Sequence, residues 1–135
     1  MTPLSRWQLN KGEEEKIKNV FLDELVSITK TDEMRSMVKA LMSETEYLML
    51  AKRLVAFVLV EEGKTDVEIG KMLHVTRATA NRFRMAYLRA KDKSEAVVKV
   101  VDKVKRSEIM NEILKSLLRY LITSAGGRIP RRGIF

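Results

Sequence analysis

The sequence contains no cysteine, one histidine (His74) and only two prolines (Pro3 and Pro130) among its 135 residues. Without cysteine there is no disulfide framework, no thiol nucleophile and no thiolate metal site, and one histidine is too few for a histidine-based metal site. We therefore expect no enzyme, no bound metal and no cofactor. Because both prolines lie near the ends, nothing between them breaks a helix by ring geometry.

Long hydrophobic runs are also missing. The apolar stretch from Tyr47 to Val60 is interrupted by Lys52 and Arg53, and it falls short of the roughly 20 residues that a membrane-spanning helix needs. The opening segment MTPLSRWQLNKGEEE does not have the apolar centre of a signal peptide. We expect a soluble cytoplasmic protein with no membrane partner.

Positive charge is concentrated in the second half of the chain. The net charge is +8, but the residues up to Gly63 contain 9 Lys/Arg against 11 Asp/Glu, whereas those from Lys64 onward contain 17 against 7. Such asymmetry favours a polyanionic partner, with nucleic acid first and an anionic membrane surface second.

The apolar periodicity predicts an all-α fold with no strand. Helices are expected at about 13–28, 32–41, 43–61, 66–73 and 76–91. Two of these starts carry the S/T-x-x-E capping box, Ser43 with Glu46 and Thr65 with Glu68. The first helix carries an apolar face formed by Ile17, Val20, Phe21, Leu25 and Ile28. The third helix is apolar on most sides, so we expect it to be central or to be buried by a partner chain.

The segment EIGKMLHVTRATANRFR (68–84) has the spacing of a helix-turn-helix. A steep turn between two short helices needs one residue near positive φ, and histidine is among the side chains that tolerate it, so His74 is assigned to the turn. Gly70 is expected where the two helices cross, and Thr76 is expected to cap the second helix. The alternatives are a catalytic or metal-binding role for His74 and a plain αα-hairpin that serves packing alone.

Basic residues and small polar residues dominate the outward face of the second helix. The stretch from Thr76 to Lys91 contains five basic residues and no acid, whereas a merely solvated face usually mixes signs. Arg, Asn and Ala suit guanine edges, adenine edges and thymine methyl groups, respectively. We predict base contacts by Arg77, Ala78 and Asn81, and phosphate contacts by Thr65, Thr76, Arg82, Arg84 and Arg53. For Arg53 and Arg82, surface cations or salt-bridge partners remain the alternative.

The segments FLDELVSITKTDEM, SETEYLMLAKRLVAFVLVEEGKTDVEIGKMLHV and TRATANR resemble the Trp repressor-like family, especially its Trp repressor-related members. The resemblance covers roughly Phe21 to Arg89, about half of the chain. It implies a DNA-binding transcriptional regulator that acts as an intertwined homodimer, with the second helix of each helix-turn-helix at a major-groove half-site. It also implies association with the nucleoid.

The resemblance further implies positions for a ligand pocket. In the family, tryptophan lies between two arginines and near a threonine, and the matching positions here are Arg53, Arg82 and Ser43. The tryptophan-binding member has glycine immediately after the second arginine, whereas this chain has Phe83. A phenyl ring at that position occupies the space of the indole, so we expect DNA binding without a tryptophan corepressor.

The C-terminal region lies beyond the resemblance. Ser94 is expected to cap a helix that carries Val97, Val101 and Val104, and a second apolar series follows a phase slip near Ser107. This predicts one bent amphipathic helix or two consecutive ones, for packing or dimerisation rather than membrane binding. The predicted organisation is an N-terminal arm (1–12), a Trp repressor-like domain (13–91) with its helix-turn-helix at 65–91, a C-terminal helix or helix pair (92–124) and a basic flexible tail (125–135).

Two other functions are compatible with the same sequence. One is an RNA-binding or polymerase-associated helical module, since such modules carry similar helix-turn-helix units. The other is a helical interaction protein in which the C-terminal helix recruits a partner. Salt dependence separates nucleic-acid binding from the second alternative, because phosphate contacts weaken as salt rises.

Overall fold

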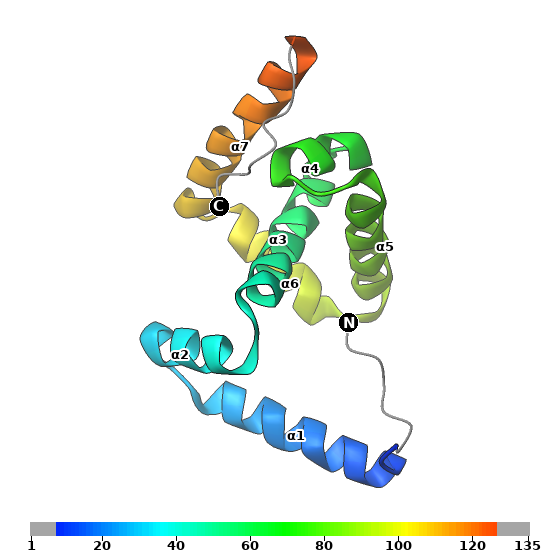
Figure 1. Ribbon diagram of the computed structural model, residues 1–135, viewed down its shortest axis with the longest axis vertical. Coiled ribbons are helices and arrows are strands. Elements are labelled where there is room, and N and C mark those ends of the chain that lie inside the picture. Colours follow the sequence, from blue (N-terminus) through cyan, green and yellow to red (C-terminus); the bar gives the residue numbers. More distant parts are fainter. Residues whose placement is uncertain (1–7, 127–135) are drawn as a thin grey trace. The chain divides into compact units, whose positions relative to one another are not determined.

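The computed structural model describes residues 8–126, with side chains placed up to residue 122, and within this range the chain is helical without a strand. Seven helices follow one another there (Figure 1): α1 (Lys11–Ser27), α2 (Thr31–Leu41), α3 (Glu44–Glu61), α4 (Asp66–Leu73), α5 (Arg77–Lys93), α6 (Glu95–Lys105) and α7 (Glu108–Gly126). The all-α prediction is confirmed, and the predicted helices match α1 to α5 within a few residues.

The chain divides into two compact units, Met1–Tyr47 and Leu48–Phe135. The first unit contains α1 and α2, and neither helix buries a residue. Asn10 begins α1, because its side-chain oxygen accepts from the backbone N–H of Glu13 at 2.8 Å. On the predicted apolar face of this segment, Ile17, Val20 and Phe21 are exposed, with Val20 64% exposed, whereas Leu25 and Ile28 are half-buried.

The second unit contains the hydrophobic core, and α3 supplies residues to both of its clusters. The larger cluster joins α3, α4, α5 and α7 through Ala56, Leu59, Ile69, Met72, Leu73, Ala80, Phe83, Leu117 and Tyr120. The smaller cluster joins α3, α5, α6 and α7 through Val58, Tyr87, Val101 and Met110. Helix α4 packs against both α5 and α7, so the C-terminal helices belong to the same unit as α4 and α5 (Figure 1).

The turn between α4 and α5 has the predicted geometry. Thr65 and Glu68 form a complete capping box at the start of α4, and His74 follows the helix at φ 55° and ψ 49°. Thr76 accepts from the backbone N–H of Thr79 and so caps α5. Gly70 is buried where α4 meets the turn. A Cβ built there would lie only 2.9 Å from the carbonyl oxygen of Val75, so a larger residue does not fit without a shift.

The C-terminal region forms two consecutive helices, and the break falls where the apolar phase slips. Ser107 accepts from the backbone N–H of Met110 at 3.2 Å and thereby caps α7. The predicted cap at Ser94 is wrong, because Ser94 stands before α6 but makes no side-chain capping bond. The physical reason is that Ser94 also ends α5, where its backbone N–H donates to Ala90, and no separate turn intervenes.

Some predictions concern residues that fall outside the described range. These are most of the N-terminal arm (1–12) and nearly all of the basic tail (125–135). Among residues 8–126, no helix is long and apolar enough to cross a membrane. Within the same part of the chain, no group of three or more His, Cys, Asp or Glu side chains is placed to hold a metal ion.

Candidate nucleic-acid interface

The first turns of α5 present the side chains that the sequence assigns to DNA. Arg77, Ala78, Asn81 and Arg82 are exposed, while Ala80, Phe83 and Tyr87 on the opposite side of α5 are buried. This division follows from the helical period, because residues three and four apart share a face. The structure therefore brings all three predicted base-contacting residues to one exposed face of α5.

A carboxylate at the start of α4 organises this face. The side-chain amide of Asn81 donates to Asp66 Oδ2 at 2.9 Å, and Nε of Arg84 donates to Asp66 Oδ1 at 2.5 Å. The guanidinium of Arg84 also donates to the backbone carbonyl of Lys64 at 2.5 Å. The hydrogen bond from Arg84, and then that from Asn81, holds the pKa of Asp66 below its usual range. Asp66 was missed at the sequence level, since spacing does not reveal that side chains 15 and 18 residues away converge on it.

These bonds leave Asn81 able to contact a base. Its amide has two N–H donors and one oxygen, and only one N–H is used by Asp66. Reading adenine requires one donor and one acceptor, which is what the amide retains. Asp66 thus restricts the orientation of Asn81 without using up its hydrogen-bonding capacity.

The predicted phosphate-contacting arginines differ in how they are held. Arg84 is partly buried and paired with Asp66, so in the free chain it joins α5 to α4. Arg82 is exposed and forms no ion pair with any described residue, and the same is true of Arg77. Salt bridges from Arg82 or Arg53 to Glu46 or Glu68 do not form, because Glu46 and Glu68 bond to the capping residues Ser43 and Thr65.

The two threonines predicted at phosphates both cap helices. Thr65 Oγ1 accepts from the backbone N–H of Glu68 at 3.2 Å. Thr76 Oγ1 accepts from the N–H of Thr79 at 3.1 Å and donates to Thr79 Oγ1 at 3.0 Å. Their hydroxyl groups therefore satisfy the chain itself, and the nearby helix N-termini supply partial positive charge at the same two places.

Among the side chains that match the tryptophan pocket of the resembled family, Arg53 lies against the ring of Phe83. Phe83 is 3% exposed and belongs to the larger core cluster. The guanidinium carbon of Arg53 lies 5.4 Å from the centre of that ring, a distance typical of a cation–π contact. Ser43 accepts from the backbone N–H of Glu46 and caps α3. Phe83 thus fills the space beside Arg53 with its own side chain.

The end of α5 is fixed to the end of α3 by a polar cluster. The hydroxyl of Tyr87 and the ammonium of Lys91 both donate to Glu61 Oε1, the latter at 2.7 Å. The bond from Lys91, followed by that from Tyr87, lowers the pKa of Glu61, while burial and Glu61 raise the pKa of Tyr87 above its usual value. Lys91 is therefore a structural cation in the free chain.

His74 has a second contact that its assignment to the turn did not include. Its ring meets the ring of Tyr120 edge to face, with centres 4.3 Å apart. Its Nε2 atom is buried and has no hydrogen-bond partner in the described part of the chain. Burial, and secondarily the charge of Lys52, lowers the pKa of His74. The turn between α4 and α5 is thereby packed against α7, which the sequence placed in a separate segment.

Comparison of the chain with protein-family models, with curated proteins and with solved structures found no match. The functional argument therefore depends on the residues and their geometry.

Proposed function

We propose that this chain is a sequence-specific double-stranded DNA-binding transcriptional regulator, with α4 and α5 as a helix-turn-helix of the Trp repressor-like type. The observation that carries the proposal is the exposed face of α5, where Arg77, Ala78, Asn81 and Arg82 project beside a turn with its αL residue at His74. Arg77 and Arg82 form no ion pair with any described residue, and exposed cations of this kind are available to phosphates and base edges.

In the proposed complex, the N-terminal half of α5 enters the major groove. Arg77 donates to a guanine edge, Asn81 pairs with adenine, and Ala78 touches a thymine methyl group. Arg82 and the starts of α4 and α5, at Thr65 and Thr76, meet phosphates. Arg84 keeps its bonds to Asp66 and Lys64 and positions α5, so its role differs from the phosphate contact expected from the sequence.

The regulator acts as a homodimer and needs no tryptophan corepressor. The exposed apolar residues of α1 favour a second copy of the chain, because large exposed apolar patches mark interaction surfaces. The ring of Phe83 lies against Arg53 at the place where an indole would have to enter. The phenyl ring of the chain itself therefore holds α5 in place.

The test is fluorescence anisotropy with a pool of random-sequence duplex DNA at several salt concentrations, followed by sequencing of the bound fraction. The affinity of the wild type should fall steeply as salt rises. In a plot of the logarithm of the binding constant against the logarithm of the salt concentration, the slope should be about −0.9 per phosphate contacted. Arg77→Ala/Asn81→Ala should lose the enriched sequences, and Arg82→Ala should weaken binding to all sequences and reduce the slope by about one contact.

The matched control is Arg106→Ala, because Arg106 is an exposed arginine at the C-cap of α6 that pairs with Asp102 and lies outside α5. It should bind as the wild type does. Absence of binding at low salt would overturn the proposal, as would binding that Arg77→Ala/Asn81→Ala and Arg106→Ala weaken equally.

A second candidate function is protein interaction through α7. Ile109, Ile113, Leu118 and Ile122 on this helix are exposed large apolar residues. A flat salt dependence of nucleic-acid binding would favour this candidate, and binding of promoter-like DNA only with polymerase would favour a polymerase-associated module.

A further inference from the structure

Asp66 determines which end of the Asn81 side-chain amide faces away from α4. The pKa of Asp66 is held below its usual range, chiefly by the hydrogen bond from Arg84, so the side chain is an ionised carboxylate at neutral pH. A carboxylate accepts hydrogen bonds and donates none, so the group of Asn81 that faces it is the NH₂ group. The distance from Asn81 Nδ2 to Asp66 Oδ2 is 2.9 Å. The amide therefore keeps its oxygen and one N–H for another partner.

The carboxylate of Asp66 is itself held by Arg84. Nε of Arg84 donates to Asp66 Oδ1 at 2.5 Å, and the same guanidinium donates to the backbone carbonyl of Lys64 at 2.5 Å. The side chains of Arg84 and Asp66 are only 26% and 20% exposed. Each carboxylate oxygen thus has its own partner, with Oδ1 bound to Arg84 and Oδ2 left for Asn81.

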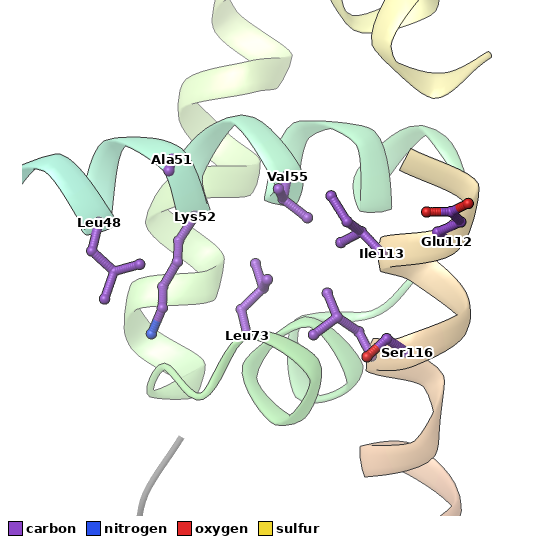
Figure 2. Close-up of a pocket in the computed structure, with 9 residues that line it drawn as sticks. Leu48, Ala51, Lys52, Val55, Leu73, Glu112, Ile113 and Ser116 are labelled. Atoms are coloured by element: carbon purple, nitrogen blue, oxygen red, sulfur yellow. The ribbon is translucent and has the colours of Figure 1, made fainter. Parts of the chain in front are cut away.

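Helix α4 is anchored by apolar contacts that do not involve Asp66. Ile69, Met72 and Leu73 are buried in the larger core cluster. Figure 2 shows the side chain of Leu73 extending from α4 towards Val55 of α3. A polar substitution at Asp66 therefore changes hydrogen bonds at the start of α4 and leaves the buried side of the helix as it is.

We propose that Asp66 is a positioning residue that sets the base preference of Asn81 to adenine without touching the DNA; this inference rests on the proposed DNA-binding function. In the major groove, adenine presents one acceptor and one donor, whereas guanine presents two acceptors, N7 and O6. An amide that offers its oxygen and one N–H matches adenine. An amide whose oxygen is already bonded offers two N–H groups and matches guanine.

Asp66→Asn reverses this arrangement while it keeps the shape of the side chain. Arginine only donates hydrogen bonds, so the oxygen of the new amide must face Arg84 and its NH₂ group must face Asn81. Asn81 then turns its own oxygen inward to accept, and its two N–H groups face outward. The base preferred by Asn81 should change from adenine to guanine. A residue that only stabilised the fold would weaken binding to all sequences alike and would not reverse a base preference.

The experiment is selection of bound sequences from a pool of random-sequence duplex DNA, with sequencing of the bound fraction. Asn81→Ala locates the base position, because that position loses its preference. There the wild type should favour adenine over guanine by about fivefold or more, the lower end of what a good bidentate contact discriminates. Asp66→Asn should favour guanine by a similar factor. Asp66→Ala, which leaves the amide of Asn81 free to turn, should select both purines about equally.

Asp102→Asn is the matched control. Asp102 is an exposed aspartate on α6 that pairs with Arg106 at 3.0 Å, so its substitution makes the same change in net charge away from α4 and α5. It should keep the preference for adenine, and thermal unfolding checks that each variant folds. Retention of adenine by both Asp66→Asn and Asp66→Ala would overturn this inference and leave the proposed function standing. A wild type that binds no DNA would overturn both.

Discussion

Asp66 and Arg84, 18 residues apart, form an ion pair with an Nε to Oδ1 distance of 2.5 Å that joins the start of α4 to the middle of α5. Both side chains are less than a third exposed, and Asp66 also accepts from Asn81. Hydrogen bonds to charged groups in such surroundings exceed the usual value of an exposed salt bridge. This pair therefore contributes to the packing of α5 against α4.

Asp66→Ala should reduce the free energy of unfolding by about 1–2 kcal/mol, because it leaves Arg84 partly buried without its carboxylate. Urea unfolding measures the loss. Asp32→Ala removes the carboxylate of an exposed i,i+3 pair with Arg35 and should leave the unfolding midpoint unchanged. Equal midpoints for Asp66→Ala and the wild type would show that the pair does not stabilise the turn.

Gly70→Ala should destabilise the folded chain by about 1–3 kcal/mol, the usual cost of forcing extra atoms into a packed site. The added Cβ would lie 2.9 Å from the carbonyl oxygen of Val75, and backbone at a helix crossing moves only with the helix. Urea unfolding again gives the value. Gly12→Ala, in the exposed first turns of α1, is the control and should be neutral or slightly stabilising. A neutral Gly70→Ala would mean that the crossing is loose.

The helices α4 and α5 and the turn between them were predictable because their determinants are local. The capping boxes at Ser43 and Thr65, the turn at His74 and the cap at Thr76 each depend on residues within three or four positions. The helical period places the predicted outward residues Arg77 and Asn81 on the side of α5 opposite the buried Ala80 and Phe83. These features are set by local hydrogen bonds and by the helical period, and both follow from the spacing of residues in the sequence.

The contacts that were missed are long-range. Nothing in the spacing of Asn81 and Arg84 indicates that both converge on Asp66, because long polar side chains have several rotamers and the neighbouring helix decides among them. The packing of Tyr120 against His74 depends on where α7 returns to α4, which the sequence of α7 does not specify. The charge of Lys52 was visible, but its burial depends on that same return.

Stability should fall as the pH decreases below about 6.5, because His74 is neutral in the folded chain. Burial lowers its folded pKa from the ordinary 6.5. Between the folded and unfolded values only the unfolded chain binds the proton, so unfolding becomes more favourable as pH falls towards the folded pKa and changes no further below it. The urea midpoint should therefore be lower at about pH 5.5 than at about pH 7.5.

His74→Asn is the matched variant for this measurement, because asparagine tolerates the αL conformation and does not titrate. His74 is the only histidine in the chain, so the variant should lose the difference between the two midpoints. A wild type that becomes more stable on acidification, or a variant with an unchanged difference, would contradict the assignment.

Tryptophan should not bind to the wild type in a calorimetric titration at micromolar protein concentration. Phe83 is buried and stacked under Arg53, so an indole has to displace a core side chain, and removing a buried phenyl ring from its site costs about 3–5 kcal/mol. Leucine, which is smaller, serves as a second ligand. Micromolar tryptophan binding would mean that Phe83 leaves the core readily.

The chain should sediment as a dimer, and the face of α1 should be required for it. Most of the stability of a helix in a protein comes from packing of its apolar face, and α1, with 17 residues, buries none of its side chains. Ile17 and Val20 are exposed on its apolar face, so burial against a second copy supplies the packing that the helix lacks. Ile17→Glu/Val20→Glu should produce a monomer with less helical circular dichroism, whereas Lys16→Glu should remain dimeric. A wild-type monomer with full helicity would show that α1 is stable without a partner, and the homodimer would then be excluded from the proposed DNA complex.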